Sequence, residues 1–180
     1  MPDLFPGKTI AKIEFQEIAN QLQEGNIDGF ILETMNNIAE TQTCLKIIEK
    51  FNIPIWVSLN LKDSLHIKSG EKIKDTINII KNFPVETILL NCNPLTRTIR
   101  ASREIKTHWR QKWGIYPNLG IGEPSPDGII NNYYTNKEFL NVIIKSINLG
   151  ANIIGGCCGS SSEHIALIKL YIKEHYDDKK

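Results

Sequence analysis

Short apolar runs rich in β-branched residues alternate along this chain with longer segments in which apolar residues recur at helical spacing. The short runs, which predict strands, lie at residues 27–32, 55–59, 86–90, 114–116 and 151–154. The longer segments, which predict helices, lie at about residues 10–22, 38–51, 73–80, 95–109, 139–147 and 165–172. A stretch rich in Gly, Pro, Asn and Asp at residues 118–134 is expected to form a long loop.

The alternation of strand and helix indicates an α/β fold with a parallel sheet, because parallel neighbours need a connection of a dozen or more residues. Two architectures share this pattern, the open doubly wound sheet and the closed eightfold barrel. No Gly-x-Gly-x-x-Gly follows the first predicted strand, which argues against a dinucleotide-binding open sheet. Five strands are too few to close a barrel alone. Periodicity by itself therefore leaves both architectures open.

Composition narrows the function classes. The chain has 180 residues, 41% of them hydrophobic, and its 21 Lys and Arg nearly balance 20 Asp and Glu, so a single globular domain is expected. The net charge of +1 argues against a nucleic-acid surface, and no apolar run reaches the roughly 18 residues of a membrane span. The opening residues do not have the pattern of a signal peptide, so we expect a cytoplasmic protein. Residues 1–9 and 176–180 are expected to be frayed ends.

Three of the four cysteines follow predicted strands, where parallel α/β folds gather their chemistry. Cys92, Cys157 and Cys158 are expected at the same side of the sheet, and three thiolates there would suit a zinc ion with an open fourth position. Neighbouring residues of a regular strand point to opposite faces, and the glycines around the Cys157–Cys158 pair would supply the backbone freedom to bring both sulfurs together. Spacing alone leaves open that the pair consists of small buried residues. Cys44 lies in a helical pattern and is expected in the core.

Several motifs together resemble the signature of the homocysteine S-methyltransferase family. They are Gly155-Gly156-Cys157-Cys158-Gly159 followed by Glu163-His164-Ile165, Leu32-Glu33-Thr34-Met35 followed by Ala39-Glu40, Val57 to Asp63 followed by Gly70, Asn91-Cys92, and Tyr116-Pro117-Asn118 followed by Gly120. Their order and spacing match from about residue 10 to residue 172. The resemblance implies that residues 1–180 form one partial homocysteine-binding domain, the C-terminal portion of a (β/α)8 barrel with about five βα units. The family's early Asp-Gly-Gly segment and first strands are missing from it.

The resemblance implies zinc-dependent transfer of a methyl group to the thiol of homocysteine, which forms methionine. It places the zinc on Cys92, Cys157 and Cys158, and coordination would deprotonate the substrate thiol. It also implies that Glu33 binds the homocysteine ammonium group, and that Asn91 either orients Cys92 or contacts the substrate. The loop that begins at Lys62 resembles members that use a sulfonium methyl donor, such as S-methylmethionine or S-adenosylmethionine. Gly159 after the cysteine pair instead resembles folate-, cobalamin- or betaine-linked members, but this chain contains no folate- or cobalamin-binding module, so a sulfonium donor is expected.

Three nearby polar sites have structural interpretations. His164 is expected to be a structural residue, Ser160 to Ser162 are expected to supply a helix N-cap, and Asn118 is also consistent with ordinary turn chemistry. An incomplete barrel would expose two strand edges, which predicts either a partner that carries the missing N-terminal half-barrel or self-association. The alternative to an enzyme is a non-catalytic zinc-binding remnant or interaction module of the same family.

Overall fold

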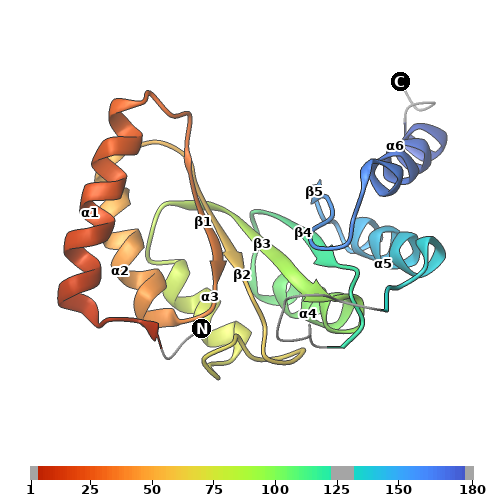
Figure 1. The fold of residues 1–180 in the computed structure, drawn as a ribbon, viewed down its shortest axis with the longest axis horizontal. Coiled ribbons are helices and arrows are strands. Elements are labelled where there is room, and N and C mark those ends of the chain that lie inside the picture. Colours follow the sequence, from red (N-terminus) through yellow and green to blue (C-terminus); the bar gives the residue numbers. More distant parts are fainter. Residues whose placement is uncertain (1–3, 123–131, 177–180) are drawn as a thin grey trace.

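The computed structural model describes residues 4–122 and 132–176, which form a five-stranded parallel sheet whose successive strands are connected by helices (Figure 1). The strands are β1 (Phe30–Met35), β2 (Ile55–Leu59), β3 (Val85–Pro94), β4 (Lys112–Asn118) and β5 (Ile153–Ile154). The helices are α1 (Lys8–Glu24), α2 (Ile38–Ile48), α3 (Ile73–Ile80), α4 (Leu95–His108), α5 (Asn136–Asn148) and α6 (Ser162–Tyr176), and a 3-10 turn, η2 (Glu49–Phe51), extends α2. The predicted α/β class is confirmed.

The strand order decides between the two architectures that the sequence left open. The sheet runs β1-β2-β3-β4-β5, so each strand pairs with the next one along the chain. A doubly wound sheet reverses its strand order at a switch point, and the described strands have no such reversal. When each new strand is added on the same side of the sheet, right-handed crossovers place all the connecting helices on one face of the sheet. Each helix accordingly contacts the next, from α1 to α6. These are five consecutive βα units of a barrel wall.

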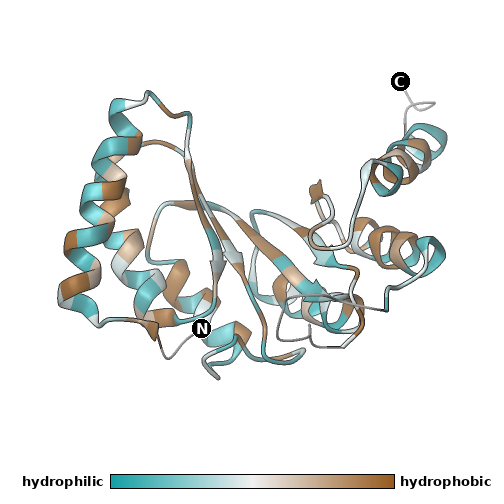
Figure 2. Cartoon of the chain, in the orientation of Figure 1, coloured by the Kyte–Doolittle hydropathy of each residue, from teal (hydrophilic) through white to brown (hydrophobic). Residues whose placement is uncertain are grey.

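The hydrophobic core lies between the sheet and the helices. Val57 in β2, Ile88 and Leu90 in β3 and Ile115 in β4 are all fully buried and belong to one apolar cluster. Central strands of a parallel sheet are covered on their faces and therefore read as apolar runs. Figure 2 shows such a run along β3, whereas the helices alternate between apolar and polar positions. Cys44 belongs to this core, as expected, with 6% of its surface exposed.

Several predicted boundaries differ from the structure. β1 begins and ends three residues later than predicted, β3 extends to Pro94, β4 extends to Asn118, and β5 has only two residues. Backbone pairing with the neighbouring strand decides these ends, and it continues through the polar residues that the apolar pattern excluded. Pro117 therefore does not end β4. Helices α1 and α6 are two to four residues longer than predicted at each end, and α5 begins three residues earlier. The other three helices begin at the predicted residue, and α3 coincides with the predicted 73–80.

The described ends of the chain and of the long loop contain regular structure. Helix α1 already begins at Lys8 and α6 continues to Tyr176, so helices extend into the segments that we expected to be frayed. The described ends of the predicted loop pair with each other, since Gly120 and Tyr133 form an antiparallel bridge. Residues 123–131 of that loop lie outside the described residues.

Within the described residues, no helix combines the length and the apolar character that a membrane span requires. The cellular location that we expected from the sequence stays a prediction.

Candidate metal and substrate site

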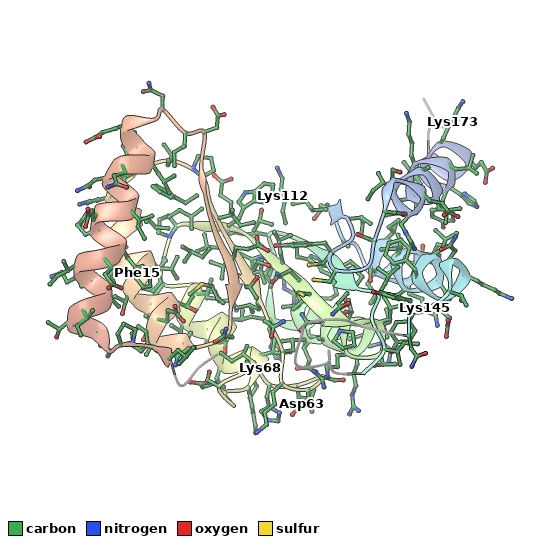
Figure 3. The ribbon with its side chains drawn as sticks, viewed as in Figure 1. Phe15, Asp63, Lys68, Lys112, Lys145 and Lys173 are labelled. Atoms are coloured by element: carbon green, nitrogen blue, oxygen red, sulfur yellow. The ribbon has the colours of Figure 1, made fainter. Side chains whose placement is uncertain are left out.

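Three cysteine sulfurs meet at the carboxyl end of the sheet. Cys92 lies in β3, and Cys157 and Cys158 follow β5. The Sγ atoms of Cys92 and Cys158 are 3.5 Å apart, those of Cys157 and Cys158 are 3.9 Å apart, and all three lie within 4.8 Å of one another. Sulfurs that share a tetrahedral zinc at about 2.3 Å lie about 3.8 Å apart. Figure 3 shows yellow sulfur atoms gathered beside the sheet. The three residues could therefore hold one metal ion.

A bulge in β3 brings Cys92 to this cluster. The register between β3 and β4 shifts between Asn91 and Pro94, and Cys92 has a positive φ of 53°. In a regular strand, neighbouring side chains would point to opposite faces of the sheet. The extra residue of a bulge interrupts that alternation. Cys92 can therefore approach Cys158 while the Asn91 side chain joins the polar cluster described below.

The backbone after β5 is fixed by the end of β4. The N–H of Cys157 donates to the carbonyl of Pro117 at 2.9 Å, and the N–H of Leu119 donates to the carbonyl of Cys158 at 2.9 Å. Gly159 adopts a φ of 76°, and a Cβ there would lie 2.7 Å from the Tyr133 ring. Of the glycines around the pair, only Gly159 is in the left-handed region.

Burial keeps the thiols of Cys92 and Cys157 protonated in the metal-free site. Burial, with a smaller effect of the neighbouring thiols of Cys158 and Cys157, raises the pKa of Cys92 to about 12. Burial is also the main reason that the pKa of Cys157 is raised. A thiol binds a metal as its thiolate, so metal binding at these cysteines must release protons.

A polar cluster lies beside the cysteines and is centred on Asn91. Its side-chain N–H groups donate to Glu33 Oε1 at 2.9 Å and to Thr34 Oγ1 at 2.7 Å, and its Oδ1 accepts from Ser58 at 2.6 Å. The Tyr116 hydroxyl lies 2.9 Å from both Glu33 carboxylate oxygens and 2.7 Å from Ser58 Oγ. Glu33 is exposed, and the ion pairs found among the described residues do not include it. The cluster therefore presents a carboxylate that no cation from the described residues neutralises.

Thr34 carries backbone strain in this cluster. It has a φ of 57°, which is unusual for a β-branched residue, and the register of β1 shifts around it between Leu32 and Met35. The hydrogen bond from Asn91 holds its hydroxyl. The bulges of β1 and β3 are thus joined through one asparagine side chain.

The structure places the predicted Glu33 and Asn91 in hydrogen-bond contact and adds residues that sequence reasoning missed. The sequence motifs contain Tyr116, Ser58 and Thr34 but indicate no role for them. The position of Tyr116 at the end of its strand could have identified it, because Tyr116 is the in-register neighbour of Asn91 on β4. Burial raises the pKa of Tyr116, and Glu33 raises it further, although the hydrogen bond with Ser58 opposes the shift. The phenol is consequently a hydrogen-bond donor at neutral pH.

Polar residues after the cysteines support the backbone. His164 is buried, its Nδ1 accepts from the N–H of Ser161 at 3.1 Å, and its ring lies edge-on against Phe139 at 5.2 Å. Ser161 directly precedes α6, so this bond supplies one half of a capping box. Ser160 instead donates to the carbonyl of Cys157 at 2.6 Å. The side chain of Asn118 accepts from the N–H of Gly120 at 2.7 Å, which is turn chemistry.

The fold and the site define a segment of a parallel α/β barrel with a thiol triad at the carboxyl ends of its strands. The model of the family described as homocysteine S-methyltransferase matches residues 8–172. The chain belongs to the homocysteine S-methyltransferase family.

Individual relatives agree with this assignment. The chain is 28% identical to homocysteine S-methyltransferase 2 of Arabidopsis thaliana over 82% of its own length and 46% of the relative. It is also 28% identical to selenocysteine Se-methyltransferase of Brassica oleracea var. italica, over 82% and 44% of the two lengths. The chain spans about half the length of the curated relatives it matches.

Solved structures show the same fold. The oxidized form of the homocysteine methyltransferase MmuM from Escherichia coli matches with a TM-score of 0.74 at 22% identity, over 89% of this chain and 52% of that one. The metallated form of the same protein matches with a TM-score of 0.73 at 23% identity. The barrel portion predicted from the sequence is confirmed at the level of the fold.

Proposed function

We propose that this chain supplies the zinc- and homocysteine-binding part of a methyltransferase that forms methionine. The observation that carries the proposal is the convergence of Cys92, Cys157 and Cys158 within 4.8 Å in a chain of this family. The similar proteins named above are homocysteine and selenocysteine methyltransferases. Their names agree with a reaction in which a sulfur or selenium atom is the nucleophile.

The donor set fits zinc. Cys92, Cys157 and Cys158 would hold the ion, and three protein ligands leave a fourth position for the substrate thiol. Bound zinc lowers the pKa of a coordinated thiol, so that a thiolate nucleophile is available near neutral pH. The chain's own contribution is to hold three sulfurs at metal-binding spacing, with the bulge at Cys92 and the pairing of Cys157 with Pro117 as the fixed supports.

Glu33 and Asn91 would bind the rest of the amino acid substrate. The Glu33 carboxylate is exposed, is oriented by hydrogen bonds and has no cationic partner among the described residues, so it can receive an ammonium group. Asn91 links this carboxylate to the metal site, because it donates to Glu33 and directly precedes Cys92. The substrate would thus be held at its ammonium end by Glu33 and at its sulfur end by the metal.

A sulfonium compound, such as S-methylmethionine or S-adenosylmethionine, is the proposed methyl donor. The support is the resemblance of the loop after β2, which begins at Lys62. In the structure this loop is folded back on itself, with antiparallel bridges between Leu61 and Ile67 and between His66 and Lys72.

We also propose that a polypeptide carrying the other half of the barrel completes this chain. Large exposed apolar side chains gather at the two ends of the row of helices and on the edge strand. They are Ile10, Ile13, Ile18 and Leu22 on α1, Ile31 on β1, and Ile165, Leu170 and Ile172 on α6. The described parts of α2 to α5 contribute none. Self-association through the same edges is the other possible outcome.

An assay of methionine formation tests the proposed function. Zinc-loaded protein is mixed with homocysteine and each sulfonium donor, with and without the N-terminal half of a homologous enzyme. We expect methionine with at least one donor when the second half is present. Protein that retains zinc but neither binds nor methylates homocysteine, even with that half, would instead be the non-catalytic remnant.

A further inference from the structure

We infer that Tyr116 is a positioning residue that fixes the Glu33 carboxylate for the ammonium group of an amino thiol substrate. The inference rests on the proposed function, because it takes Glu33 as the ammonium ligand. It assigns a role to a side chain that reaches the site from β4, 83 residues away from Glu33 in the sequence.

The count of donated hydrogens identifies the role of the phenol. Asn91 Oδ1 can only accept, so Ser58 donates its single hydroxyl hydrogen to it at 2.6 Å. Asn91 uses its two side-chain hydrogens on Glu33 Oε1 and on Thr34. Among the described residues, Tyr116 is therefore the donor that reaches Glu33 Oε2, at 2.9 Å.

The phenol has two acceptors for one hydrogen. It lies 2.7 Å from Ser58 Oγ as well as 2.9 Å from each Glu33 oxygen. The charged carboxylate is the stronger acceptor when the site holds no substrate. An ammonium group bound to Glu33 would neutralise the carboxylate and make it a weaker acceptor. The phenol could then donate its hydrogen to Ser58 Oγ instead. Tyr116 can thus hold the empty carboxylate and still keep a partner when the substrate occupies it.

Backbone pairing on both sides holds Tyr116 in this position. β4 pairs Tyr116 in register with Asn91 on β3, and on the other side the N–H groups of Gly155 and Cys157 donate to the carbonyls of Ile115 and Pro117, the two neighbours of Tyr116 in the chain. Loss of the hydroxyl would leave Glu33 with the Asn91 bond to Oε1 alone. The carboxylate could then rotate about that bond. The three cysteines have no hydrogen bond to the phenol, so the metal site should not change.

The substitution Tyr116→Phe tests the inference, because it retains the ring and removes the hydroxyl. Dissociation constants are measured by calorimetry on zinc-loaded protein, completed by the second barrel half where the wild type requires it. The ligands are homocysteine and 4-mercaptobutanoate, which has the thiol and carboxylate but no amino group. We expect the homocysteine constant to rise about tenfold, the size of one charge-assisted hydrogen bond. The analogue's constant and the zinc content should stay unchanged.

Two further variants separate positioning from a general structural effect. Tyr134→Phe makes the same change at a half-buried tyrosine outside the cluster and should alter neither constant. The double variant Tyr116→Phe with Glu33→Gln should bind homocysteine as Glu33→Gln does, since the phenol acts through the carboxylate. Equal weakening of both ligands by Tyr116→Phe, or additive effects in the double variant, would overturn the inference alone. A wild type that holds zinc but binds neither thiol would overturn the proposed function and the inference with it.

Discussion

Cys44 and Cys92 have the same side chain in different surroundings. Cys44 lies on α2 inside the core, where burial and the charge of Glu40 raise its pKa to about 12. Burial and the neighbouring thiols raise the pKa of Cys92 to about 12 as well. Only Cys92 has two other sulfurs within reach, so a metal ion can replace its proton there. The presence of other thiols nearby, and not the pKa alone, therefore distinguishes a candidate metal ligand from a structural cysteine.

Metal content should follow this difference. The purified protein is expected to hold about one zinc ion per chain. Cys92→Ser should lose most of it, because two thiolates remain at an open site, whereas Cys44→Ser should retain it. Elemental analysis of the wild type and both variants measures the ratio. Equal zinc content in the two variants would show that Cys92 is not a ligand.

Cys44 should make stability dependent on pH in the alkaline range. Its pKa rises from an ordinary 9.0 to about 12 on folding, so the folded state holds this proton more tightly. The stabilisation is fully present below about pH 9 and is lost as the pH rises toward 12, by at most about 1.4 kcal/mol per pH unit.

Urea denaturation of metal-free wild type and Cys44→Ala at pH 7 and pH 10, under reducing conditions, isolates this contribution. The wild type should be the more stable at pH 7, because the substitution leaves a cavity. Its advantage should shrink at pH 10, since only the wild type carries the thiol. An advantage that is the same at both pH values would contradict the prediction.

At the scale of elements, β4 and β5 approach each other closely enough to require a glycine. Gly114 pairs with Ile153, and a Cβ at Gly114 would lie 2.2 Å from the Ile153 carbonyl oxygen. β5 has only two residues and leads directly to Cys157 and Cys158. The position of two proposed ligands thus depends on one short pairing between strands.

Gly114→Ala should therefore weaken zinc binding by at least about tenfold, because the clash separates β5 from β4. Gly29→Ala is the matched control, since its Cβ would lie 2.9 Å from the Pro54 carbonyl oxygen at the other end of the sheet. Both variants should have a lower melting temperature, but only Gly114→Ala should lose zinc to a competing chelator. Equal zinc affinity in the two variants would mean that β5 does not position the cysteines.

At the scale of the whole molecule, the exposed apolar side chains mark where the barrel wall is open. A groove between α1 and β1 is lined by Ile18, Leu22 and Ile31, each at least 45% exposed. Among the strands that the structure describes, β1 and β5 pair with a neighbour on one side only. Unpaired parallel edges with apolar faces promote association with other chains.

The isolated protein is accordingly expected to be oligomeric or prone to aggregation, and to bind homocysteine weakly or not at all. Addition of the N-terminal half of a homologous enzyme should raise both solubility and thiol binding. Ile18→Lys should reduce self-association, whereas Leu65→Lys, at an exposed apolar residue away from the edges, should not. Light scattering and calorimetry measure the two properties. A stable monomer that binds homocysteine tightly would contradict this expectation.

The sequence by itself determined the elements and the candidate ligands. Apolar periodicity predicted the five strands and six helices in order, because helix and strand place their buried side chains at different intervals. It also located Glu33, Asn91 and the three cysteines at strand ends, where a parallel sheet collects its polar residues. The family motifs then favoured a barrel, which periodicity alone had left beside the open sheet.

Only the tertiary structure decided how those residues meet. The bulges at Thr34 and Cys92 appear as shifts of register between paired strands, and no local pattern of apolar residues encodes them. The contact between Tyr116 and Glu33 joins β4 to β1, so it depends on strand order and on register at once. Side-chain direction along one strand follows from its sequence, but the partner across the sheet is fixed only when all the strands have paired.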